Sequence, residues 1–199
     1  MADCYDYPVT SSARTIPAIL NTVFLDRDGV LNEKMPEGSY VRSLDDFHIL
    51  PGVPDAIGSL NRAGMRVIVI SNQRGISLGL YTAGDVDAIH GGFQKVLANH
   101  GAHIDAFFIC PHDREQCNCR KPLPGLFEQA AAKFPGISAA SSVMIGDSLV
   151  DIEFARSLRM TAILIDNAGP PRPDDELARQ LADLHFFSLA EAVSALLRK

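Results

Sequence analysis

Acidic residues follow two of the short apolar segments of this 199-residue chain. Asp26 and Asp28 come directly after the apolar sequence TVFL, and Asp147 and Asp151 come shortly after SVMI. Taken singly, an acidic residue after a strand is most often a turn or helix-cap residue. Four carboxylates at one edge of a sheet, however, cannot all stay ionised without a counter-cation. Together they indicate a site for a hard divalent ion.

Magnesium suits such a site better than zinc or a softer metal, because it prefers a few carboxylate oxygens, retained waters and phosphate oxygens. A phosphoryl substrate also needs fixed hydrogen-bond donors. Ser71, at the end of a second apolar segment, and Lys121, just before a predicted helix, can supply them. The sequence therefore predicts magnesium-dependent phosphoryl chemistry on a small molecule.

A second group of candidate metal ligands comprises Cys110, His112, Cys117 and Cys119, which fall within ten residues. Three thiolates and one imidazole are typical of a closed, tetrahedral zinc site of the structural kind. The alternative is a redox pair or a set of unrelated buried thiols. A zinc ion bound here would hold the loop that leads into Lys121.

Short apolar segments alternate with amphipathic ones along the chain. We predict strands at residues 22–25, 66–70, 104–109, 142–145 and 161–165, and helices at residues 54–62, 82–99, 124–134, 149–158, 174–184 and 189–197. Such alternation predicts an α/β fold, a parallel sheet with helices on both faces. Because these sheets bind ligands at the carboxyl ends of their strands, the polar residues that follow the strands should meet at one edge.

Composition limits the kinds of partner. The net charge of -6 and the pI near 5.4 argue against a nucleic-acid binder, which needs a basic face. No apolar run approaches the roughly 20 residues that cross a bilayer, and the N-terminus lacks a secretory signal, so a cytoplasmic protein is expected. We expect a flexible tail at residues 1–20, a single domain at residues 21–199, and a monomer.

Four sequence motifs, FLDRDGVLN, SNQRG, RKP and IGDSLVD, resemble the four ordered motifs of haloacid dehalogenase-type phosphatases. The resemblance covers residues 22–165 and implies a three-layer Rossmann-like fold. It implies that Asp26 attacks phosphorus to form an aspartyl-phosphate, and that Asp28 protonates the leaving group and then activates water. Ser71 and Lys121 would hold the phosphoryl oxygens.

The resemblance also implies how magnesium is held. Asp26, the backbone carbonyl of Asp28 and Asp147 would bind the ion, and Asp151 would orient a metal-bound water. Only about 20 residues follow Asn32 before the first helix, and about ten follow the second strand, too few for a separate cap domain. The site is therefore expected to be open and able to admit a sugar bisphosphate.

The cysteine-histidine loop before RKP resembles a narrower branch, the D-glycero-D-manno-heptose 1,7-bisphosphate 7-phosphatases and the related histidinol-phosphate phosphatases. SYVRSLDDFHILPGV (residues 39–53) resembles the heptose enzymes, whereas residues 33–38 depart from their pattern and the zinc loop is short. The resemblance implies removal of the 7-phosphate in the synthesis of activated heptose for lipopolysaccharide or other glycans. A histidinol-phosphate or other small phosphomonoester phosphatase is the alternative.

Two further alternatives belong to other classes. A catalytically inactive, zinc-stabilised binding module should have lost one or more of Asp26, Asp28, Lys121 and Asp147, yet the chain has all four. A nucleic-acid end phosphatase would share the motifs but would need a basic channel.

Contacts to the rest of the substrate are predicted from residues beside the motifs. Arg120, Arg74 and Tyr40 are candidates for its distal part, and the guanidinium fork of an arginine suits a second phosphate. For Arg74 and Tyr40, a solvated surface position explains the sequence equally well. Arg27, Asn72 and Gln73 complete the predicted substrate-binding set.

Overall fold

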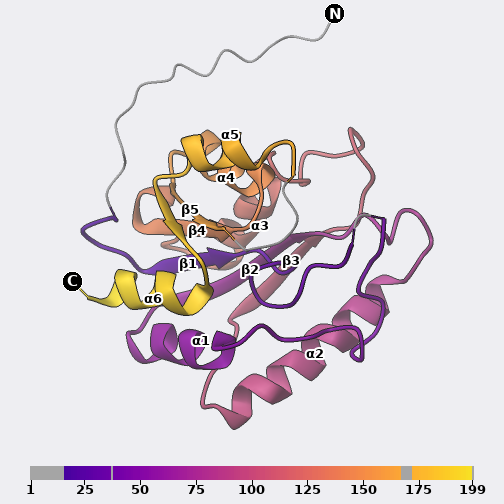
Figure 1. Ribbon diagram of the computed structural model, residues 1–199, viewed down its shortest axis with the longest axis horizontal. Coiled ribbons are helices and arrows are strands. Elements are labelled where there is room, and N and C mark those ends of the chain that lie inside the picture. Colours follow the sequence, from indigo (N-terminus) through magenta and orange to yellow (C-terminus); the bar gives the residue numbers. More distant parts are fainter. Residues whose placement is uncertain (1–15, 37, 167–171, 199) are drawn as a thin grey trace, which may run out of the picture.

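The computed structural model describes residues 16–36, 38–166 and 172–198. It shows one sheet between two layers of helices (Figure 1). No helix in these ranges is both long and apolar enough to cross a membrane. Of the predicted tail, residues 1–15 lie outside the described part of the chain, whereas Ile16 and Leu20 pack against the core.

The sheet has six strands, all parallel, in the order β3-β2-β1-β4-β5-β6. They are β1 (Thr22–Leu25), β2 (Arg66–Asn72), β3 (Ala106–Cys110), β4 (Ser142–Gly146), β5 (Thr161–Ile165) and β6 (Leu184–Phe186). The chain runs outward from β1 to β3 and then returns to the other side of β1 to form β4. This reversal places the carboxyl end of β1 at a topological switch point, where such sheets bind ligands.

Three helices cover each face of the sheet (Figure 1). On one face lie α1 (Val53–Arg62), α2 (Ala83–Asn99) and α6 (Leu189–Leu197). On the other lie α3 (Gly125–Lys133), α4 (Leu149–Ser157) and α5 (Asp175–Leu181), and a single 3-10 turn (Ala139–Ser141) precedes β4. The predicted three-layer α/β fold is thereby confirmed.

The central strands contribute to two hydrophobic cores because successive side chains point to opposite faces of a sheet. From β1, Val23 and Leu25 join the core under α1, α2 and α6, whereas Phe24 joins the core under α3, α4 and α5. All three side chains are fully buried. A strand held from both faces in this way gives the residue that follows it, Asp26, a rigid base.

The predicted elements agree with the structure except near the C-terminus. Thr82 caps α2 through a capping box with Asp85, as its position before the helix predicted. The predicted helix at 174–184 is wrong in its last part, because the helix ends at Leu181 and Leu184 begins strand β6. This three-residue edge strand is only partly buried, so it lacks the apolar run that marks the inner strands.

His90 on α2 is a buried histidine close to the site. Its ring stacks on that of Phe107 with the centroids 4.1 Å apart, and its Nε2 has no hydrogen-bond partner among the described residues. Burial and, to a smaller extent, the positive charge of Arg27 together lower the pKa of His90 to about 3. The folded protein therefore keeps this ring neutral.

We predict that His90→Phe makes the fold less sensitive to acid. Because folding depresses the pKa of His90, the contribution of this residue to stability is complete above the unfolded pKa near 6.5. As the pH falls below that value, the unfolded state binds a proton that the folded state does not, and the free energy of unfolding decreases. At pH 5 the wild type should lose roughly 2 kcal/mol through this residue. Urea unfolding at pH 7 and pH 5 measures the difference. Equal losses in wild type and variant would contradict the assignment.

Candidate active site

Three buried carboxylates meet at the carboxyl edge of the sheet. Asp26 follows β1, Asp147 follows the neighbouring strand β4, and Asp151 lies in the first turn of α4. Carboxylate oxygens of the three lie within 4.8 Å of one another. The turn after β1 is tied to β4, because the backbone N–H of Asp26 donates to the carbonyl of Ile145 at 2.9 Å. Adjacent strands thus bring the first and last motifs together.

The ammonium of Lys121 lies between two of these carboxylates. Its Nζ donates to Asp26 Oδ1 at 2.7 Å, to Asp151 Oδ1 at 2.6 Å and to the carbonyl of Ile70 at 2.9 Å. Burial raises the pKa of Asp26 to about 7; Lys121 opposes the rise, and the charges of Asp151 and Asp147 add to it. The three carboxylates therefore carry more negative charge than Lys121 alone can balance.

The predicted magnesium ligands fit the observed geometry. Asp147 Oδ1 is buried and has no hydrogen-bond partner among the described residues, so it is free to bind an ion. Gly29 has a φ of 95°, and a Cβ added there would lie 2.6 Å from the Asp147 carboxyl carbon. Only glycine lets the backbone beside Asp28 approach Asp147 so closely. Asp26, Asp147 and that backbone could together hold a divalent ion.

The side chain of Asp28 points to a different set of partners. Arg27, itself buried, donates to both carboxylate oxygens at 2.9 Å, Asn32 donates at 3.0 Å and Gln73 at 3.2 Å. Burial alone would raise the pKa of Asp28, but Arg27 and the hydrogen bonds from Asn32 and Gln73 outweigh it and lower the pKa. Asp28 is thus ionised in the substrate-free site.

Gln73 links Asp28 to Ser71. Its Nε2 also donates to Ser71 Oγ at 2.7 Å, and its Oε1 accepts from the hydroxyl of Tyr81 at 2.8 Å. Because Ser71 Oγ is the acceptor, its own proton remains available for a phosphoryl oxygen. The hydrogen bond from Tyr81 thus fixes the orientation of the Gln73 amide, with its NH2 group toward Ser71. Sequence analysis missed Tyr81, which lies in a loop ten residues away and carries no motif signal.

These residues surround a cavity of about 320 Å³. Most of the predicted site residues line it: Asp26, Arg27, Asp28, Tyr40, Ser71, Asn72, Gln73, Arg120, Lys121, Asp147 and Asp151. The NH1 group of Arg120 is buried and has no hydrogen-bond partner among the described residues. Arg120 therefore lines the cavity with a hydrogen-bond donor that no described residue uses.

Arg74 and Asn72 are engaged with the protein itself. Arg74 does not line the cavity and forms an ion pair with Asp113, with Nε to Oδ1 at 2.5 Å. The amide of Asn72 donates to the carbonyl of Lys121 at 3.1 Å and accepts from its N–H at 3.0 Å. Asn72 therefore positions Lys121, and direct binding of substrate by Arg74 or Asn72 stays a prediction.

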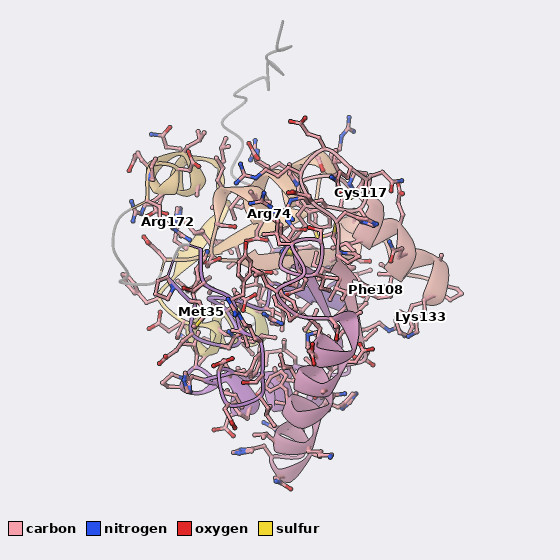
Figure 2. All side chains as sticks on the ribbon, turned by 90° about the vertical axis from the view of Figure 1, so that its right-hand side faces the viewer. Met35, Arg74, Phe108, Cys117, Lys133 and Arg172 are labelled. Carbon is pink, nitrogen blue, oxygen red and sulfur yellow. The ribbon has the colours of Figure 1, made fainter. Side chains whose placement is uncertain are left out.

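Two cations that sequence analysis did not single out contact Asp147. Lys34 Nζ lies 2.7 Å from Asp147 Oδ2 and Arg172 NH1 lies 2.9 Å from the same oxygen, while Arg172 NH2 donates to the Asp147 carbonyl. Figure 2 shows Met35, the neighbour of Lys34, and Arg172 on the same side of the molecule. Lys34 falls in residues 33–38, which depart from the pattern of the heptose enzymes. This departure was the only feature of the sequence that pointed to Lys34.

Cys110, His112, Cys117 and Cys119 come together as predicted. Cys117 Sγ lies 3.5 Å from Cys110 Sγ and 3.4 Å from Cys119 Sγ, and His112 Nδ1 lies 3.6 and 3.3 Å from the same two sulfurs. A disulfide would bring two sulfurs to about 2.05 Å, so these thiols are not bridged. Zinc with bonds of about 2.0 to 2.3 Å would separate tetrahedral ligands by about 3.6 to 3.8 Å. The cluster therefore fits zinc, with a small outward adjustment.

The loop that carries this cluster also carries Lys121. Cys119 precedes Lys121 by two residues, and the carbonyl of Cys110 accepts from the N–H of Gln73 at 2.8 Å. Figure 2 shows Cys117 and Arg74 on the face that holds the strand ends. The cysteine cluster thus anchors the segment that delivers the lysine to Asp26.

A parallel α/β sheet whose central strand ends in a buried carboxylate, beside a lysine and a candidate divalent-ion site, is typical of metal-dependent hydrolases. The chain belongs to the haloacid dehalogenase-like hydrolase family, whose model matches residues 21–159. The family and the phosphoric monoester hydrolase class predicted from the four motifs are thereby confirmed.

Three proteins similar to this chain are named as heptose 1,7-bisphosphate phosphatases. A Mycobacterium tuberculosis protein named D-glycero-alpha-D-manno-heptose-1,7-bisphosphate 7-phosphatase is 42% identical over 141 residues, 70% of this chain and 74% of the relative. The Escherichia coli K12 protein named for the beta anomer is 33% identical over 193 residues, 92% of this chain and 95% of the relative. A D,D-heptose 1,7-bisphosphate phosphatase from B. bronchiseptica, solved with magnesium and phosphate, has a TM-score of 0.78 at 30% identity over 90% of this chain and 99% of its own.

We predict that Cys117→Ser releases zinc. The serine hydroxyl is a poor zinc ligand, so the variant should contain little metal and melt on the order of 10 °C lower. Elemental analysis and thermal melting measure both effects. Cys4→Ser, outside the described residues, is the matched control and should retain the metal. Wild-type protein that contains no zinc when purified without chelators would rule out the site.

We predict that Tyr81→Phe lowers kcat about tenfold and changes KM little. The tenfold loss corresponds to the free energy of about one hydrogen bond. Without the hydroxyl, the Gln73 amide is free to turn and to present its oxygen to Ser71. Steady-state kinetics, with a thermal melt to verify that the fold is intact, measure the effect. A kcat within twofold of wild type would show that Tyr81 does not position Gln73.

Proposed function

We propose that this chain is a magnesium-dependent phosphatase that removes the 7-phosphate of a D-glycero-D-manno-heptose 1,7-bisphosphate through an aspartyl-phosphate. The observation that carries the proposal is the convergence of Asp26, Asp28, Ser71, Lys121 and Asp147 on one cavity. Each of these side chains comes from one of the four motifs, and no two of the motifs are adjacent in sequence.

In the first step a carboxylate oxygen of Asp26 attacks phosphorus, and the bond from phosphorus to the sugar oxygen breaks. Lys121 and Ser71 donate to the non-bridging phosphoryl oxygens, which stay on phosphorus when the sugar oxygen leaves. When bound, magnesium supplies positive charge to the carboxylates and to the phosphoryl group. In the second step water attacks the aspartyl-phosphate, which frees phosphate and restores Asp26.

Asp28 gives a proton to the leaving sugar oxygen in the first step and takes one from water in the second. Its lowered pKa in the substrate-free site suits the second role. The negative charge of a phosphoryl group beside it opposes ionisation, so substrate raises the pKa of Asp28 and favours the first role. The ion pair with Arg27 keeps the carboxylate in one position throughout.

The substrate is assigned from the cavity together with the relatives. Arg120 presents a buried donor without a partner, which suits a second phosphate, and Tyr40 lines the same cavity. Relatives named for the alpha and the beta anomer of the bisphosphate are both similar to this chain, so either anomer is a candidate. A structural zinc ion, a monomeric state and a cytoplasmic location remain predictions from sequence.

A substrate panel tests the proposal. With magnesium present, phosphate release is measured from both anomers of heptose 1,7-bisphosphate, from histidinol phosphate and from p-nitrophenyl phosphate. We expect kcat/KM for one heptose anomer to exceed that for histidinol phosphate by about 100-fold or more. A preference for histidinol phosphate would instead identify the chain as a histidinol-phosphate phosphatase.

Asp26→Asn is the control for the mechanism. The substitution is nearly isosteric and removes the nucleophile, so turnover should fall about a thousandfold or more while the thermal melt shows an intact fold. Residual activity within tenfold of wild type would contradict attack by Asp26. If the wild type hydrolysed no phosphate ester at all, the result would instead support the alternative of a catalytically inactive binding module.

A further inference from the structure

Lys34 occupies an unusual position for a cavity residue. It lies on the loop between β1 and α1, its side chain is 44% exposed, and its Nζ contacts an Asp147 carboxylate that is only 4% exposed. It forms no other ion pair among the described residues. A flexible surface lysine has thus placed its charge on one of the proposed magnesium ligands.

This contact opposes an ion on the same carboxylate. Asp147 Oδ1 is free to bind magnesium, which binds carboxylate oxygens at about 2.0 to 2.1 Å, whereas Lys34 contacts Oδ2 at 2.7 Å. The ammonium would then lie close to a divalent cation of the same sign. Binding of the ion must therefore weaken the contact of Lys34.

Arg172, the second cation on Asp147, is held more firmly. It also donates to the Asp147 carbonyl and forms an ion pair with Asp175 at 2.8 Å, and it does not line the cavity. Lys34 does line the cavity, together with the following residues of its loop and Arg120. Of the two cations, Lys34 is the one that can turn into the cavity when it leaves Asp147.

The cavity has few acceptors to receive Lys34. Asp26 and Asp151 already accept from Lys121, and Asp28 already accepts from Arg27. Water can solvate the partly exposed Lys34, and a phosphate group of the ligand is the one further anion that a bound substrate would bring to the cavity. The transferred phosphate lies against Asp26, Ser71 and Lys121 in the proposed reaction, so the acceptor for Lys34 is the phosphate that is not transferred.

We propose that Lys34 pairs with Asp147 while no magnesium is bound and, when the ion binds to the same carboxylate, turns to the non-transferred phosphate of a bisphosphate substrate. Lys34 is then a specificity residue that couples metal binding to recognition of the second phosphate. The contact of Lys34 with the second phosphate rests on the proposed function, whereas the effect of Lys34 on magnesium binding does not.

The first test measures magnesium binding without substrate. Isothermal titration calorimetry compares wild type with Lys34→Met, which keeps the length of the side chain and removes its charge. We expect the variant to bind magnesium about tenfold more tightly, because no ammonium on the same carboxylate opposes the ion. Lys95→Met on α2, an exposed lysine that does not line the cavity, makes the same change in net charge and should match wild type.

The second test measures the phosphate contact. Lys34→Met should raise KM for heptose 1,7-bisphosphate about tenfold and change KM for heptose 7-phosphate less than about twofold, because the monophosphate lacks the group that Lys34 binds. Lys95→Met should alter neither value. A loss of general electrostatic attraction would instead raise both KM values in both variants.

The outcomes separate the two proposals. Unchanged magnesium affinity in Lys34→Met, or an equal rise in KM for both substrates, would overturn this inference and leave the proposed function standing. Failure of the wild type to hydrolyse the bisphosphate would overturn the proposed function and, with it, the role of Lys34 at the second phosphate. Tighter magnesium binding with a selective rise in KM would support the whole inference.

Discussion

The ammonium of Lys121, buried between the carboxylates of Asp26 and Asp151, is the contact on which the rest of the site depends. A buried charge without partners costs several kcal/mol, so all three protons of this nitrogen must have acceptors. The third goes to the carbonyl of Ile70. One side chain thereby joins the ends of β1 and β2 to the start of α4. Both hydrophobic cores hold β1 and β2, and one of them holds α4.

Lys121 comes from a loop rather than from a strand or helix, and the structure compensates for that. Asn72 makes two hydrogen bonds to the Lys121 backbone, and the cysteine-histidine cluster ends two residues before it. Loops are ordinarily more mobile than the elements they connect. The cysteine-histidine cluster is thus a means of giving a loop residue the precision of a strand residue.

The fold and the centre of the site could be predicted from sequence because both depend on local patterns. Inner strands are continuous apolar runs, and the residues that follow them must meet at one edge, which located Asp26 and Asp147. The edge strand β6 was missed because it is short and half exposed, so its pairing with β5 decides its conformation. The partners of Tyr81, Arg74 and Lys34 could not be predicted either. Each lies on a loop, and its contact depends on the path of a second segment.

Gly29 belongs to the part of the site that does not tolerate substitution, whereas the loop that follows it does. Its missing side chain lets the backbone beside Asp28 lie against Asp147, and any larger residue would collide with that carboxylate. The spacing between the turn after β1 and Asp147 is therefore set by the main chain, and no side chain at residue 29 can adjust it. Diversity of substrate must then come from the segment that follows, around Lys34 and Tyr40. A designer who seeks a new phosphate ester would begin with that loop and leave the turn at Gly29 untouched.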